Sequence, residues 1–158
     1  MTTMRTMFMA LLAAGAVANA SAQEAFDACD LFTLAEAQKA LGAAAEPEPV
    51  NPKAKKPKVV PACTYRGTKD GKPVSASATF RFARTDADAQ RAFDEEKLKF
   101  QTKPMIIGGL PAFWSAKLGN LQLLKGRTWL VVAVGGAKPV DRDAEASKKV
   151  AELLAKKL

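Results

Sequence analysis

The chain has two cysteines, Cys29 and Cys63, and they are the residues whose chemistry is most constrained. Their spacing is wrong for the C-x-x-C motif of redox enzymes, and two thiols without a histidine make a poor zinc site. An even number of cysteines favours a disulfide in an oxidising compartment. We therefore expect a structural disulfide between Cys29 and Cys63, with a pair of free thiols as the alternative.

The sequence contains no histidine. This excludes histidine-based acid–base catalysis, Ser-His-Asp and Cys-His nucleophile pairs, and histidine metal sites. Neighbouring acids such as Asp86 and Asp88, or the run 94–96, could mimic a carboxylate dyad, but a dyad needs burial or close approach. We interpret these acids as a solvated helix face. The protein is therefore predicted not to be an enzyme and to hold no cofactor or metal.

Basic residues are the candidates for binding. The net charge of +8 is compatible with anionic partners, although it could also serve solubility alone. Segment 43–61 combines most of the nine prolines with a lysine run, a composition typical of extended, solvated chain. We predict a mobile loop that the disulfide spans. Its lysines either contact an anionic envelope surface or are simply solvated: Lys53, Lys55, Lys56 and Lys58.

Two further groups of residues could contribute to a site. Arg81 and Arg84 come at the end of an alternating strand and, with Lys125 and Arg127, could line an anion site. Trp114 could line an apolar groove, although packing in the core is the default role of a tryptophan. In a strand, Phe113 and Trp114 would point to opposite faces, so one of them is expected to be partly exposed.

Residues 1–22 have the features of an export signal. Arg5 is the only charged residue, an apolar stretch covers 7–18, and small-x-small cleavage sites occur at 18–20 and 20–22. The stretch is too short for a transmembrane helix. We expect a mature chain that starts at Ser21 or Gln23, has no transmembrane segment, and is periplasmic or secreted.

Residues 23–158 suit one domain. Thr33 and Glu36 form a capping-box pattern before a helix at 34–41, and Gly42 ends it. Strands are predicted at 62–66 and 74–82, followed by a helix from 87 to about 102 and an apolar connector at 105–111. Three more strands at 112–116, 121–125 and 128–134 precede a final helix at 144–157. The last strand is apolar on both faces, which predicts a central position.

This order of elements predicts an α+β fold. About five mostly antiparallel strands joined by tight turns would form one sheet, with the helices packed on it.

Several motifs resemble those of small exported bacterial envelope proteins of unknown function. They are CDLFTLAE at 29–36, ALG at 40–42, CTY at 63–65 and GLPAFW at 109–114. The resemblance implies a PsbP-like α/β/α sandwich, one disulfide and an envelope location, and it implies no catalytic residue. Pro111 stands where such proteins have an acidic residue, and the lipidation cysteine that some of them carry is missing.

The sequence favours an exported, non-enzymatic envelope protein that binds a protein or an anionic envelope polymer. The export signal weighs against a nucleic-acid partner. The alternative is a small-ligand-binding protein or an enzyme with a pocket between sheet and helices, for which a deep pocket near Arg81 or Trp114 is the expected sign.

Overall fold

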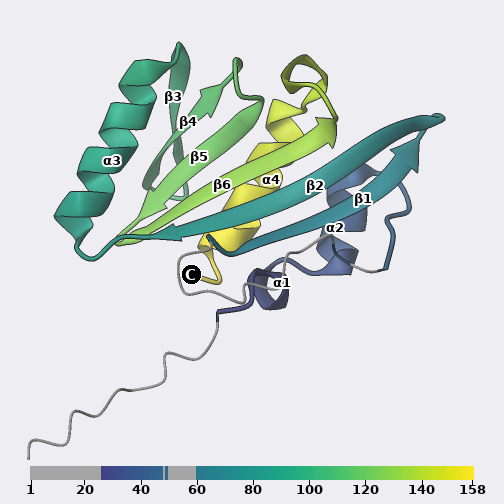
Figure 1. Ribbon diagram of the computed structural model, residues 1–158, viewed down its shortest axis with the longest axis horizontal. Coiled ribbons are helices and arrows are strands. Elements are labelled where there is room, and N and C mark those ends of the chain that lie inside the picture. Colours follow the sequence, from purple (N-terminus) through teal and green to yellow (C-terminus); the bar gives the residue numbers. More distant parts are fainter. Residues whose placement is uncertain (1–25, 48, 50–59) are drawn as a thin grey trace, which may run out of the picture.

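Alternating apolar and polar residues produce the strands of a single antiparallel sheet. The computed structural model describes residues 26–47, 49 and 60–158 (Figure 1). The strands are β1 (Ala62–Lys69), β2 (Lys72–Phe82), β3 (Thr102–Ile107), β4 (Leu110–Ser115), β5 (Asn120–Lys125) and β6 (Thr128–Gly136). Their order across the sheet is β1-β2-β6-β5-β4-β3, and every neighbouring pair is antiparallel. The α+β class is confirmed, and β6 has the central position that its apolar residues predicted.

The sheet has six strands instead of about five, because β3 was not expected. The predicted helix to about residue 102 and the connector after it are wrong: α3 (Asp86–Lys99) is shorter, and β3 begins at Thr102. Pro104 cannot donate a backbone hydrogen bond, but β3 lies at the edge of the sheet, where only one side is paired. Gly108 and Gly109 then turn the chain into β4 with φ angles of 58° and 81°.

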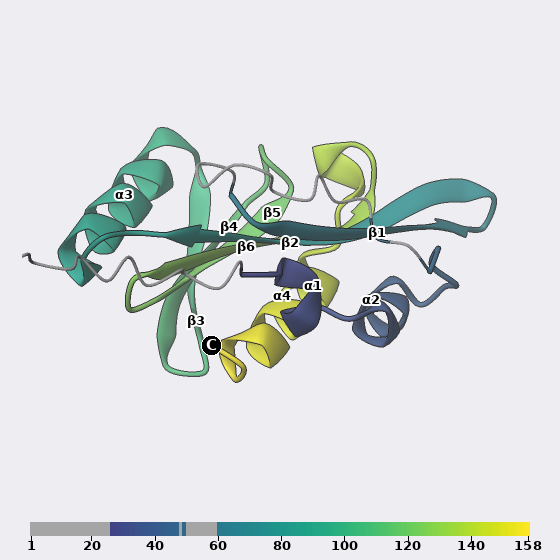
Figure 2. The same cartoon turned by 60° about the horizontal axis from the view of Figure 1, so that its bottom comes forward.

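The helices cover the two faces of the sheet unequally. Figure 2 shows three of them on one face: α1 (Ala28–Leu31), α2 (Leu34–Leu41) and α4 (Ala144–Ala155). The opposite face carries α3 at one end and the short helix η1 (Pro139–Asp141) at the other. Both predicted caps are present, since Thr33 and Glu36 form the capping box of α2 and the side chain of Asp143 accepts a hydrogen bond from the Ala146 amide at the start of α4.

The buried side chains form a large cluster and a small one. Phe32, Phe80, Leu130 and Leu154 belong to the large cluster, which lies between the sheet and α1, α2 and α4. The small cluster lies under α3 and consists of five buried residues: Ala89, Phe93, Phe113, Leu124 and Trp129. This second face is therefore covered by α3 at one end and by η1 at the other, and between them the described part of the chain places no helix over β1 and β2 (Figure 2).

The disulfide between Cys29 and Cys63 is present and joins α1 to β1, with 5.1 Å between the two Cα atoms. Cys63 is fully buried beside Phe32 in the large cluster. The bond therefore fixes the first helical turn to the outermost strand of the sheet.

The start of the predicted proline- and lysine-rich loop pairs with the sheet. Ala45 forms a β-bridge with Gly67, and the Glu46 amide donates to the Arg66 carbonyl at 2.7 Å. This short pairing covers part of the free edge of β1. The lysines of the loop, Lys53, Lys55, Lys56 and Lys58, lie outside the described residues, as does the predicted export signal.

None of the helices formed by the described residues has the length and hydropathy needed to span a bilayer.

Candidate anion-binding site

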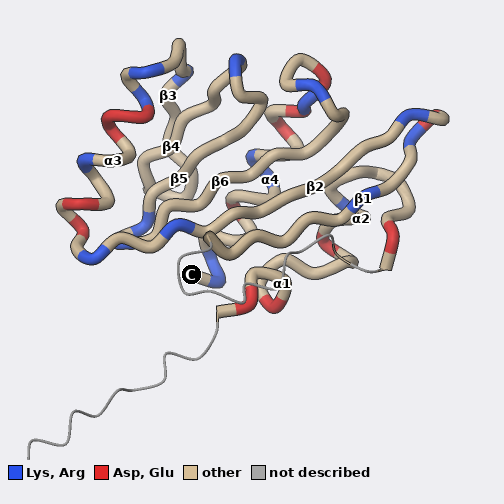
Figure 3. Tube along the Cα trace, in the orientation of Figure 1, with Lys and Arg blue, Asp and Glu red and all other residues tan. Residues whose placement is uncertain are grey.

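The charges are distributed unevenly between the sheet and the rest of the molecule. None of the six strands contains an aspartate or glutamate. The strands do contain six basic residues: Arg66, Lys69, Lys72, Arg81, Lys103 and Lys125. Figure 3 shows the acidic residues on helices and connecting segments only. By alternation, Arg66 and Arg81 are the strand cations that lie on the face opposite the large cluster, and no strand acid offsets them.

Four arginines gather where β2 leads into α3, and we call them the arginine corner: Arg81, Arg84, Arg91 and Arg127. The β5–β6 turn meets this junction, since the Ala83 amide donates to the Arg127 carbonyl at 2.9 Å. Thr85 caps α3 and so fixes the direction in which the helix leaves the strand. The end of β2, the start of α3 and the β5–β6 turn, which are separate in the sequence, thereby contribute arginines to the same region of the molecule.

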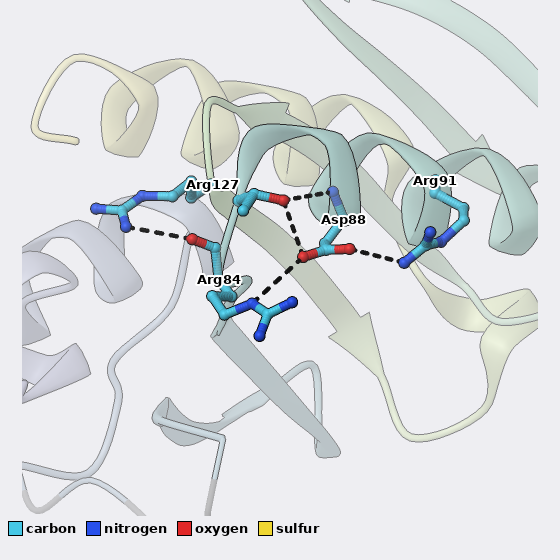
Figure 4. Close-up of polar contacts among 5 residues, drawn as sticks. Arg84, Asp88, Arg91 and Arg127 are labelled. Carbon is cyan, nitrogen blue, oxygen red and sulfur yellow. Dashed lines mark hydrogen bonds and ion pairs between the residues drawn. The ribbon is translucent and has the colours of Figure 1, made fainter.

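Asp88 organises the helical side of the corner (Figure 4). Its carboxylate lies 2.7 Å from Nη2 of Arg91 and 4.0 Å from Nε of Arg84. It also accepts a hydrogen bond of 2.8 Å from the Thr85 hydroxyl. Arg127 completes the group by donating to the Arg84 carbonyl at 3.5 Å. The Arg84 side chain is 91% exposed, so its guanidinium remains accessible to a partner.

Arg81 is oriented by an aromatic ring. The carbon at the centre of its guanidinium lies 4.6 Å from the ring centroid of Trp129, a cation–π contact. Trp129 is itself fixed, because it is buried and its indole N–H donates to Gln122 at 3.0 Å. The Gln122 amide group in turn donates to Asn120. This chain of contacts holds the Arg81 side chain on the open face of the sheet, which is the face that carries α3.

The chemistry of the arginine corner is that of anion binding. A guanidinium stays protonated and offers a planar set of N–H donors that matches carboxylate, sulfate and phosphate groups. The acids on the first turn of α3, Asp86 and Asp88, offset only part of the four positive charges. An arginine cannot serve as a general base at neutral pH, so the corner suits recognition and not proton transfer.

Three of the four basic residues predicted to form an anion site are brought together. Arg81, Arg84 and Arg127 lie at the corner, but Lys125 does not. Leu124 points toward the cluster under α3, so by alternation Lys125 points to the other face, where its ammonium donates to the Ala155 carbonyl at 2.9 Å. Lys125 thus stabilises the C-terminal end of α4.

Trp114 and Arg81 lie on opposite faces of the sheet. Trp114 is partly buried and packs against the large cluster, while Phe113 is fully buried under α3. The predicted opposite orientation of these two neighbours is confirmed. In the described structure, Trp114 therefore serves packing, apart from the arginine corner.

Sequence reasoning missed Arg91. Its spacing of three residues from Asp88 on a helix was the available signal, since residues three apart lie on the same helical face. The importance of the pair becomes clear only when the fold places Arg84 and Arg127 beside it.

A cavity of about 350 Å³ lies between the β3–β4 turn and the end of α4. Its lining is partly apolar and partly charged: Ile107, Gly108, Leu110, Lys125, Glu152, Ala155 and Lys156. Neither Arg81 nor Trp114 lines it, so it is a different pocket from the one considered near those two residues.

Among the described residues, no group of three or more histidines, cysteines or acids could hold a metal ion. Comparisons with protein-family models, curated proteins and solved structures find no match for this chain. The resemblance to exported envelope proteins thus stays a prediction from the motifs.

Proposed function

We propose that this protein is an exported, non-enzymatic protein of the cell envelope that binds an anionic partner through the arginine corner. The observation that carries the proposal is that three neighbouring segments contribute four arginines to one region, with the Arg84 side chain almost fully exposed. Charge-assisted hydrogen bonds from guanidiniums are among the stronger polar contacts, and several acting together favour a multiply charged partner.

The disulfide supports the predicted location. Cys63 is fully buried, and a buried disulfide that joins two elements is typical of proteins that fold in an oxidising compartment. Together with the predicted export signal, it favours a periplasmic or secreted protein.

The predicted lysine loop would extend the same function. Lys53, Lys55, Lys56 and Lys58 come shortly before β1 in the sequence, so they would add positive charge to a protein that already favours anions. Their contribution can be measured separately, by comparing the arginine variants with a variant in which the four lysines are replaced by glutamine.

The test is co-sedimentation of the purified mature protein with an envelope fraction at low salt. The double variant R84Q/R127Q should lose about tenfold or more in affinity, because each lost charged contact is worth about 1 kcal/mol or more. The matched control is K39Q/K149Q, which removes the same charge from exposed positions on α2 and α4. Equal loss of affinity in both double variants would show that binding depends on net charge and not on the arginine corner. No loss in R84Q/R127Q would contradict the proposal.

A small-ligand protein with a sheet–helix pocket is the second candidate, and the 350 Å³ cavity is the observation that favours it. Its volume lies near the lower end of the range for ligand pockets, about 300–1,000 Å³. Native protein would be incubated with a mixture of small metabolites and analysed by mass spectrometry. A bound molecule that is lost when L110W fills the cavity would support this candidate, and absence of any such molecule would count against it.

A further inference from the structure

We infer that the anionic partner is a linear acidic polysaccharide that lies along β2, from the arginine corner to Arg66. This inference rests on the proposed function and deepens it by naming the class of partner and its path. Three observations support it: a row of hydroxyl groups on the open face, basic residues at both ends of that row, and the absence of acidic residues from the strands beneath it.

The hydroxyl row, which consists of Ser75, Ser77, Thr79 and Thr64, follows from strand alternation. Ala76, Ala78 and Phe80 of β2 point into the large cluster, so the residues between them point to the opposite face. The register places Thr64 of β1 beside Ser77 on this face. On the other side of β2, Ala133 and Val131 of β6 lie opposite Ser77 and Thr79. These side chains are short, so they do not project above the hydroxyl groups.

Basic residues occupy both ends of the hydroxyl row. At one end Arg81 follows Thr79 with the same alternation and is held on Trp129. At the other end Arg66 pairs in register with Ser75, and Arg142 donates to the Ser75 hydroxyl at 3.3 Å. Figure 3 shows basic residues toward both ends of β2 and neither charge along its middle.

The dimensions suit a chain and not a single small anion. From Ser75 to Arg81 the strand advances about 20 Å, at roughly 3.4 Å per residue. Two cationic ends at this distance can bind one ligand together only if the ligand is long enough to reach both. The second contact would then be intramolecular, which raises the affinity without any change in either end.

The hydroxyl row distinguishes a polysaccharide from other polyanions. Serine and threonine hydroxyls both donate and accept, which matches the hydroxyl groups of sugars. Nucleic acid, by contrast, presents a phosphate at every step and favours a groove of continuous basic charge. An acidic peptide would gain most by pairing with a strand edge, and the edge of β1 is partly covered by Ala45.

The experiment compares two lengths of a labelled oligogalacturonate by fluorescence anisotropy with the mature protein. The dimer is shorter than the distance between the two ends, and the decamer exceeds it. We expect the decamer to bind at least about tenfold more tightly than the dimer after correction for the number of binding registers. A neutral oligosaccharide of ten residues is the control for charge and should not bind.

Variants along β2 test where the polysaccharide binds. R66Q should weaken binding of the decamer and leave binding of the dimer unchanged, whereas R84Q/R127Q should weaken both. T79V keeps the shape of the side chain and removes its hydroxyl, and it should weaken binding of the decamer by about threefold. The control K39Q/K149Q should change neither.

The outcomes separate the inference from the proposed function. Equal affinity for both lengths, with R84Q/R127Q still weakening both, would overturn the inference and leave the proposed function standing. No effect of R84Q/R127Q on either probe would count against both. Equal affinity for an oligoglutamate of ten residues would overturn the assignment to a polysaccharide.

Discussion

The Lys157 ammonium lies 2.6 Å from the Glu36 carboxylate, although 121 residues separate them in the chain. The same ammonium donates to the Leu31 carbonyl at 2.7 Å, and the other oxygen of Glu36 accepts from the Thr33 amide at 2.9 Å. A single carboxylate therefore caps α2 and holds the end of α4. Helices from opposite ends of the described chain are joined by one ion pair.

Because of this ion pair, the free energy of unfolding should depend on pH. Burial alone would raise the pKa of Glu36, but hydrogen bonds from Lys157 and Thr33 outweigh it, so the pKa lies below its ordinary value of 4.5. A lowered pKa in the folded state stabilises the fold above the ordinary value, and that stability is lost as the pH falls through the lowered one. The free energy of unfolding, measured in urea, should therefore exceed that of E36Q by a constant amount above about pH 5. The difference should shrink as the pH falls below the ordinary value and through the lowered pKa. A difference that does not change with pH would contradict this account.

The disulfide should contribute about 4 kcal/mol to stability in the chain-entropy model for a loop of this length. The double variant C29S/C63S should unfold at correspondingly lower denaturant concentration than the oxidised protein. Adding a reductant to the native protein should reproduce the loss. The double variant, which serves as the control, should not respond to reductant. A reductant effect of equal size in both proteins would exclude the disulfide as its cause.

Local patterns predicted most of the elements because each depends on residues near one another. The capping box at Thr33 and Glu36 and the alternation from Val74 to Phe82 specify a helix and a strand without reference to the rest of the chain. The missed strand was β3, since Pro104 reads locally as the end of a helix. Its place at the edge of the sheet, which makes the proline tolerable, is a property of the whole topology.

The candidate site was predictable only in part. Arg81, Arg84 and Arg127 drew attention as basic residues near strand ends, and the fold does bring them together. The cation–π platform of Trp129 could not be foreseen, because it requires β6 to pair with β2 so that Trp129 stands opposite Arg81. The absence of acids from the sheet is visible in the sequence, but it has meaning only once the strands lie side by side.

Gly67 should resist substitution even by alanine. A Cβ atom at this position would collide with the Ala44 carbonyl oxygen, where the start of the predicted loop pairs with β1. G67A should therefore destabilise the protein by roughly 1–3 kcal/mol, as overpacking usually does. Urea unfolding measures the loss, and T68A on the same strand is the control, expected to change stability by less than about 0.5 kcal/mol. Wild-type stability in G67A would show that this pairing does not form in solution.

Trp129 should influence both stability and binding, whereas Arg81 should influence binding alone. W129F keeps an aromatic ring beside Phe93 but removes the N–H that satisfies the buried Gln122 carbonyl. An unsatisfied buried acceptor costs about 1–3 kcal/mol, so W129F should unfold at lower urea concentration. R81Q changes an exposed side chain and should leave stability within about 0.5 kcal/mol of wild type. Both variants should weaken binding of an anionic oligosaccharide, R81Q by loss of the charge and W129F by loss of the platform that orients it. If W129F were destabilised but bound with wild-type affinity, the ring would serve packing only, and Arg81 would not need it for recognition.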